Sequence, residues 1–241
     1  MSTGFSNEND LHFAMFGKKF HELSKHIQEN IILKLDPDFS PNGVVLCSKI
    51  GGNKKPDLEI VLNKKSYFLS IKKGSGNSVH QEKLDTFIPY LQKEFNITPE
   101  IVNHIKLFIW SDGTIDGSGE VSDRMSLRQM SIKYNEEKNI VQTFFELNKI
   151  KLIRRFMQYG RNEDQIGASH IYYGEVNSGC LKPIDRVIDY LALNNGGGIL
   201  NIGKLSFQAW NVVKNGNPNT EDRRGIIQLK WGGINTEINY I

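Results

Sequence analysis

Asp57 and Lys72 lie in two neighbouring segments that both alternate apolar and polar residues, the pattern of β-strands. Residues 56–73, PDLEIVLNKKSYFLSIKK, therefore predict a β-hairpin that brings this carboxylate close to this amine. A carboxylate that holds a divalent cation, beside a lysine that orients or deprotonates water, is what hydrolysis of a phosphodiester requires. The alternative interpretation is a cross-strand ion pair without a catalytic role, which at an exposed position stabilises a protein by only about 0–1 kcal/mol.

The register of this hairpin decides which side chains face one another. With residues 64–65 as the loop, which is the register we expect, Asp57 lies opposite Lys72; with residues 63–64 it lies opposite Ser70. Both registers leave the same residues on each face, because side chains alternate along a strand. The apolar face, which we expect to pack on the core, consists of Leu58, Ile60, Leu62, Tyr67, Leu69 and Ile71.

The expected cofactor is Mg²⁺, which prefers oxygen ligands and keeps several waters, so that one or two carboxylates suffice. Asp57 and the backbone carbonyl of Ile71 are the predicted ligands. Two further acids compete for a place in the site. Glu59 shares the face of Asp57, and Glu82 is expected in the first turn of a helix, where it binds metal or interacts only with the helix dipole.

The elements that position these residues predict an α/β (α+β) fold with a mixed central sheet flanked by helices. Apolar spacings of three and four residues predict helices, and short apolar or alternating runs predict strands. The helices are expected over residues 12–35, 78–95, 136–158 and 183–193, and the strands over 43–49, 105–110, 204–210 and 225–231. The Gly-, Ser- and Asp-rich residues 111–124 predict a boundary between domains 1–124 and 125–241.

The composition is that of a soluble globular chain: 241 residues, of which 39% are hydrophobic and 24% charged. Two cysteines, Cys47 and Cys180, are too few for a disulfide framework, which favours a reducing, cytoplasmic environment. We expect neither export nor membrane association, since neither a signal peptide nor a long apolar run is present in the sequence.

Two regions have the residue types that bind DNA. The basic run 147–161 contains Lys151, Arg154 and Arg155 and has no acid, as phosphate contacts require. Residues 204–231 are rich in the Arg, Asn, Gln and Asp side chains that read base edges in the major groove. The predicted DNA contacts in this second region are Gln208, Asn219, Asp222, Arg223, Arg224, Gln228 and Lys230. Outside both regions, Lys73 is predicted to contact a phosphate.

The order helix, strand, strand with Pro56-Asp57, strand with Ser70-Ile71-Lys72, helix resembles the catalytic core of PD-(D/E)XK nucleases. The chain departs from that pattern at Ser70, where the family usually has Asp or Glu, which leaves the number of bound metals open. A polar non-acidic residue there resembles the small MspI-like restriction endonucleases. The segment GKKFHE is similar to the opening helix of that branch, and the segment 203–233 is similar to its DNA-reading strands.

This resemblance implies a type II restriction endonuclease that hydrolyses double-stranded DNA at a short sequence with Mg²⁺. It implies catalytic roles for Asp57 and Lys72, contact of Ser70 with metal-bound water, and assistance from Glu22 or Glu82. The first domain would be the nuclease core and the second the DNA-recognition region. It also implies a monomer, with a DNA methyltransferase in the host but not in a stable complex. A repair or junction nuclease with the same core, or a non-catalytic DNA-binding module, is the alternative.

Overall fold

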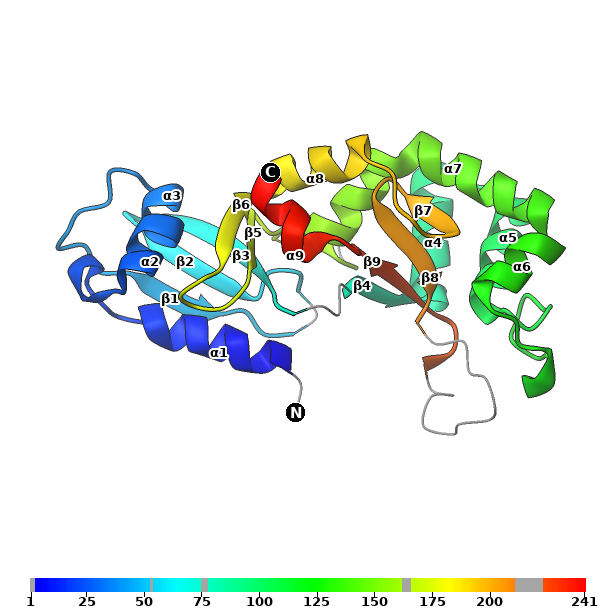
Figure 1. Ribbon diagram of the computed structural model, residues 1–241, viewed down its shortest axis with the longest axis horizontal. Coiled ribbons are helices and arrows are strands. Elements are labelled where there is room, and N and C mark those ends of the chain that lie inside the picture. Colours follow the sequence, from blue (N-terminus) through cyan, green and yellow to red (C-terminus); the bar gives the residue numbers. More distant parts are fainter. Residues whose placement is uncertain (1–2, 53, 75–77, 162–165, 211–222) are drawn as a thin grey trace. The chain divides into compact units, whose positions relative to one another are not determined.

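The computed structural model describes residues 3–52, 54–74, 78–161, 166–210 and 223–241 (Figure 1). The protein is a mixed α/β protein of two compact units. The first unit consists of Met1–Asn77, Arg154–Tyr190 and Gly233–Ile241, and the second of Ser78–Ile153 and Leu191–Gly232. These units do not follow the expected division at residue 124, since residues 111–124 lie within the second unit.

The sheet of the first unit has the strand order β1-β2-β3-β5-β6. Strands β3 and β5 are parallel and the other neighbours are antiparallel, so the sheet is mixed. The strands are β1 (Leu46–Lys49), β2 (Leu58–Leu62), β3 (Lys65–Lys72), β5 (His170–Tyr173) and β6 (Cys180–Pro183).

The hairpin of β2 and β3 turns at Asn63 and Lys64, because Leu62 pairs with Lys65. The expected loop at residues 64–65 is therefore wrong by one position. Both turn residues have positive φ angles, 49° and 67°, as a type I′ turn requires, and asparagine at the first of them tolerates this conformation better than most residues. Asn63 Nδ2 also donates to Asp36 Oδ2 at 2.8 Å. The predicted apolar face is confirmed, since all six of its side chains are buried in the core.

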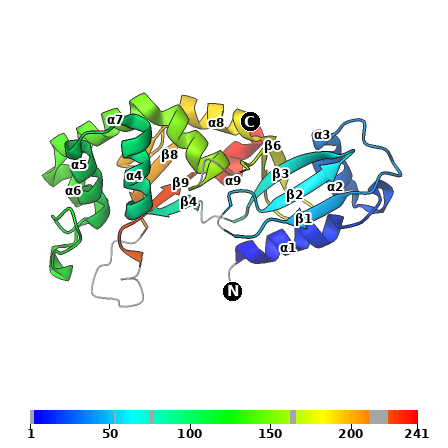
Figure 2. The ribbon, with the colours of Figure 1, turned by 180° about the vertical axis from the view of Figure 1, so that it is seen from behind.

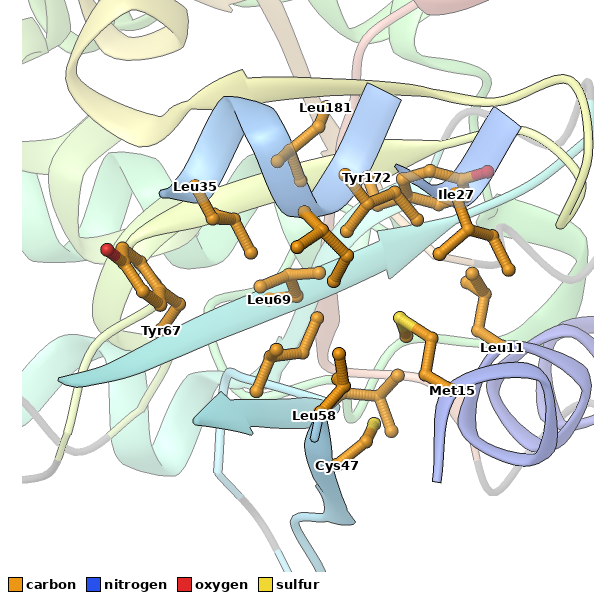
Figure 3. Packing of buried hydrophobic residues seen from close by; sticks show 14 of the residues in the cluster. Leu11, Met15, Ile27, Leu35, Cys47, Leu58, Tyr67, Leu69, Tyr172 and Leu181 are labelled. Carbon is orange, nitrogen blue, oxygen red and sulfur yellow. The ribbon is translucent and has the colours of Figure 1, made fainter. Parts of the chain in front are cut away.

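Short helical segments cover the apolar face of this sheet. The single helix expected over 12–35 is wrong: α1 (Thr3–Met15) ends before Gly17, which has a φ of +68°, and Phe13 and Phe16 are exposed. Figure 3 shows Leu11 and Met15 of α1 pointing toward Leu58 and Leu69. The later segments are η1 (Phe20–Glu22), α2 (Lys25–Ile27), the π-helical turn η2 (Gln28–Ile32) and α3 (Leu33–Leu35).

The later helical segments divide between the two units: residues 135–153 belong to the second unit, and residues 154–190 and 234–240 belong to the first. The helices expected over 136–158 and 183–193 are confirmed, the first of them as α7 followed by a π-helical turn, η4. The bounds of these segments are α7 (Asn135–Arg154), η4 (Arg155–Tyr159), α8 (Ile184–Leu193), α9 (Ile234–Glu237) and η6 (Ile238–Tyr240).

The second unit contains an antiparallel sheet with the order β4-β9-β8-β7. Its apolar face packs on helices: the ring of Phe207 lies 6.0 Å from that of Phe87 on α4 (Leu84–Phe95) and 4.8 Å from that of Phe145 on α7. Figure 2 shows α4 and α7 beside this sheet. The strands are β4 (Ser78–Lys83), β7 (Leu200–Ile202), β8 (Leu205–Ala209) and β9 (Ile226–Lys230).

Two expectations for the second unit are wrong. The helix expected over 78–95 begins only at Leu84, because Ser78–Lys83 pairs with β9 as a strand. The strand expected over 105–110 is part of helix α5, which begins at Pro99 after the N-cap Thr98. A short apolar run fits a buried helix as well as a strand. The helices are α4 (Leu84–Phe95), α5 (Pro99–Trp110), η3 (Val121–Asp123) and α6 (Leu127–Lys133).

Within the part of the chain that the structure describes, every helix is too short or too polar to cross a membrane.

Candidate active site

Asp57 and Lys72 lie at the same end of the β2–β3 hairpin, and both side chains are partly exposed. Lys72 Nζ is 3.8 Å from Asp57 Oδ2 and donates to the carbonyl of Ile71 at 2.9 Å. Asp57 Oδ2 accepts from the backbone N–H of Ile71 at 2.5 Å, and Asp57 N donates to Leu69 O at 2.8 Å. The hairpin thus holds a carboxylate, a backbone carbonyl and an amine together.

Ser70 lies on β3, two residues before Lys72. Because Leu58 pairs with Leu69, the same register places Ser70 opposite Asp57. Its residue exposure is 1%, and its hydroxyl has no hydrogen-bond partner among the described residues. A buried hydroxyl without a partner costs free energy, about 1–3 kcal/mol. A partner supplied by a bound water would therefore stabilise this site.

Glu8 on α1 is a further acid that sequence reasoning missed. Burial raises the pKa of Glu8, the negative charge of Asp57 raises it further, and Lys72 and Lys49 act in the opposite direction. Lys49 Nζ donates to Asn9 Oδ1 at 2.6 Å, which links α1 to the end of β1. The charge of Glu8 therefore interacts with those of Asp57, Lys72 and Lys49 at this end of the sheet.

Lys55, directly before Pro56-Asp57, was also missed. Burial and then the positive charge of Lys72 lower the pKa of Lys55 to about 7, although Asp57 opposes this shift. Near neutral pH its protonated and neutral amines therefore coexist. The signal in the sequence was its position beside the Asp57 motif.

The other acids considered from the sequence have different environments. Glu22 Oε2 accepts from the backbone N–H of Lys19 at 2.7 Å and so closes its own turn. Ser48 Oγ donates to Glu59 Oε2 at 3.4 Å. The helical setting expected for Glu82 is wrong: it is fully buried on β4 in the second unit, where its Oε2 lies 3.0 Å from His80 Nε2.

The residues around Asp57 fit Mg²⁺. In the described part of the chain, His, Cys, Asp and Glu side chains form no cluster of three or more able to hold a metal, but Mg²⁺ needs only one or two carboxylates plus waters. Asp57, the carbonyl of Ile71 and Glu8 supply oxygen donors, and the unpartnered hydroxyl of Ser70 suits a metal-bound water. The contacts of Asp57 with Leu69, Ile71 and Lys72 involve no sulfur atom, the kind of ligand that softer metals prefer.

The sheet of the second unit brings several predicted DNA contacts together. Gln208 pairs with Gln228 across β8 and β9, and Gln208 Nε2 donates to Gln228 Oε1 at 3.3 Å. Lys230 lies on β9 two residues after Gln228. The guanidinium of Arg223 stacks 4.6 Å from the ring centre of Trp210 and is exposed. Asn219 and Asp222 lie outside the described residues.

Two arginines predicted to contact DNA are buried instead. Arg224 donates to Asp112 Oδ2 at 2.8 Å and to two backbone carbonyls, and its side chain is 9% exposed. Arg155 is 2% exposed and cannot reach a phosphate from this position. Both predictions are wrong for the same reason: charge and spacing in the sequence did not reveal that Arg224 pairs with Asp112 inside the protein or that Arg155 is buried.

The remaining predicted phosphate contacts take part in surface ion pairs. Lys151 Nζ lies 2.7 Å from Glu94 Oε2, and Arg154 Nη1 lies 3.0 Å from Asp185 Oδ1. Lys73 Nζ lies 3.1 Å from Glu175 Oε1, and both residues line a surface cleft of about 690 Å³. Exposed pairs of this kind are weak, so a phosphate can compete for these cations.

Searches of protein-family models and of curated proteins with this sequence find no match. The assignment of a function therefore depends on the geometry of these residues.

Proposed function

We propose that this protein is a Mg²⁺-dependent endonuclease of the PD-(D/E)XK type that hydrolyses double-stranded DNA at a short specific sequence. The observation that carries the proposal is the juxtaposition of Asp57, the Ile71 carbonyl and Lys72 at one end of a hairpin. The order of α1, β1, β2 and β3 supports it, with Pro56-Asp57 directly before β2 and Ser70-Ile71-Lys72 at the end of β3. The element after Lys72 departs from the expected order, because it is strand β4 rather than a helix.

Asp57, Glu8 and the carbonyl of Ile71 would hold Mg²⁺, which when bound neutralises phosphate charge and lowers the pKa of a water ligand. Lys72 would orient the attacking water and balance negative charge as the water oxygen adds to phosphorus and the bond to the leaving oxygen breaks. The attacking water would release one proton to solvent, and the leaving oxygen would take one up from solvent. Ser70 holds a neighbouring water through its hydroxyl. The half-buried Lys55 adds positive charge near the phosphate only in its protonated form.

The division of roles between the units follows from their residues. Catalytic side chains belong to the first unit and the amide-bearing strands to the second. A site-specific enzyme needs both, because phosphate chemistry carries no sequence information and base edges must be read separately.

Incubation of the protein with plasmid DNA and Mg²⁺, with EDTA as control, tests this proposal. Discrete fragments that disappear with EDTA are the expected result, and a single-site plasmid should pass through an open-circular form if the enzyme is a monomer that nicks the strands in turn. Smearing would instead favour a repair or junction nuclease with the same core. A retarded but intact plasmid would identify a non-catalytic DNA-binding module.

Replacing Glu8 with glutamine should raise the Mg²⁺ concentration needed for half-maximal cleavage by about 10- to 100-fold, the usual effect of losing a group that supports a metal site. Replacing Glu22 with glutamine is the matched control and should leave it unchanged, because Glu22 only closes its own turn. Cleavage rates measured over a Mg²⁺ series distinguish the two. An equal shift for both variants would remove Glu8 from the site.

A further inference from the structure

The sheet of the second unit has a polar face that spans three strands rather than two. Gln228 on β9 pairs with Gln208 on β8 and, on its other side, with Gln81 on β4. Antiparallel partners point to the same face of a sheet, so the three glutamines form one row. Lys230 forms the next row, between Ser78 and Ser206.

The opposite face of the same strands is apolar. Phe207, Ile227 and Leu229 are buried there, and the rings of α4 and α7 pack on Phe207. Glu82 lies opposite Ile227 and so belongs to this buried side. The two faces of the sheet therefore have separate tasks, packing on one and polar contact on the other.

Hydrogen bonds between side chains orient the amides of the polar face. Gln81 Nε2 donates to Ser78 Oγ at 3.2 Å, and Gln208 Nε2 donates to Gln228 Oε1 at 3.3 Å. Gln228, at the centre of the row, is 5% exposed, whereas Gln81 and Gln208 are half-buried. The central glutamine is therefore a positioning residue, and the outer two retain surface for a ligand.

The charge of this face suits a polyanion. Its described positions on β4, β8 and β9 include Lys83 and Lys230 and no carboxylate, and Arg223 is stacked on Trp210 directly beyond β8. Glutamine makes two hydrogen bonds to adenine through its N6 and N7 atoms in the major groove. Amides held in a row between cations therefore match base edges flanked by phosphates.

We infer that β4 belongs to the DNA-reading surface and that Gln81 is a specificity-determining residue that reads an A·T base pair in the recognised sequence. The inference rests on the proposed function, because it assigns the DNA contacts of the same enzyme. It adds a strand outside the segment 203–233 to which the DNA contacts were first assigned.

Selection of bound duplexes from a randomised DNA library by the full-length protein in EDTA tests the role of Gln81 without cleavage. The wild-type protein should enrich a motif that contains an A·T pair, and Gln81→Ala should make one position of that motif degenerate and weaken cognate binding by about 5- to 150-fold, the effect of one lost bidentate contact. Gln92→Ala is the matched control: it removes the same amide from the exposed side of α4 and should leave the motif intact.

Gln81→Glu keeps the shape of the side chain and provides a second measurement if the alanine variant does not fold. A carboxylate accepts from cytosine N4, so a reading role predicts a change of preferred base at that position. Uniform weakening on all sequences, an unchanged motif, or no motif with the wild-type protein would each overturn the inference. Cleavage of plasmid in Mg²⁺, assayed in parallel, tests the nuclease separately, since it can persist when the motif does not respond to Gln81.

Discussion

Replacing Lys72 with alanine should lower the rate of DNA cleavage by about 10²–10⁴-fold, the range that a positioned acid–base group contributes. The amine of Lys72 contacts the Ile71 carbonyl and lies beside Asp57, so its loss removes the group that orients water. Sequence-specific binding should persist, because the amide row belongs to a different unit. Single-turnover cleavage and DNA affinity, measured on the same protein, separate the two effects.

The matched control for this variant is Lys65→Ala, at the other end of β3. Lys65 is exposed and lies 4.9 Å from the ring centre of Tyr67, so its removal should leave the cleavage rate within about twofold, since surface substitutions of this kind have small effects. Asp57→Asn should resemble Lys72→Ala and keep the strand end intact better than alanine. Wild-type turnover by Lys72→Ala would end the proposed mechanism.

Replacing Arg224 with alanine should destabilise the protein by about 3–5 kcal/mol, the cost of removing one partner of a buried ion pair. Arg224 donates to Asp112, whose side chain is fully buried, and its guanidinium stacks 5.4 Å from the ring centre of Trp110. The variant leaves a buried carboxylate without its cation. Urea denaturation followed by circular dichroism measures the loss in the free energy of unfolding.

The neighbouring Arg223 provides the control, because its exposed stacking on Trp210 should contribute only about 0.5–1 kcal/mol.

The stabilising effect of the Arg224–Asp112 pair should also depend on pH. Although burial opposes it, hydrogen bonds from Thr114 and Arg224 hold the pKa of Asp112 below its ordinary value of 3.8. A lowered pKa stabilises the folded protein above that value, and this contribution disappears as the pH falls through the pKa of the folded state. The difference between the two variants should therefore shrink in acid. If the Arg223 and Arg224 variants lost the same free energy of unfolding at neutral pH, the ion pair of Arg224 with Asp112 would not stabilise the protein more than the stacking of Arg223 does.

Local patterns predicted the hairpin and its apolar face, because alternation determines which side chains share a face whatever the register. They failed where tertiary pairing decides the structure. Ser78, with Gln81 three residues later, has the pattern of a helix capping box, yet residues 78–83 pair with β9, which lies more than a hundred residues later in the chain. The run at 105–110 is apolar except for Lys106, and it is too short to show a period that separates helix from strand.

In the candidate site too, residues on one local element were predictable and residues brought together by tertiary packing were not. Asp57, Ser70 and Lys72 were predictable because they lie on one local hairpin. Glu8 was not, since only the packing of α1 on the sheet brings it to Asp57. Arg224 gave the opposite error: its charge fits DNA, but its partner Asp112 comes from a segment that no spacing connects to it.

The parallel pairing of β3 with β5 also governs the order in which the chain can fold during synthesis. Leu69 pairs with His170, and all of residues 78–153 lie between them in the chain, so they must leave the ribosome before this pair can form. A nascent chain that ends before β5 has an open strand edge on β3 and lacks Tyr172 and Leu181 from its core. Such distant pairing slows folding and favours association through the open edge. DNA cleavage under the proposed function would thus await the synthesis of β5, and no single cut of the polypeptide would release the first unit as one continuous fragment.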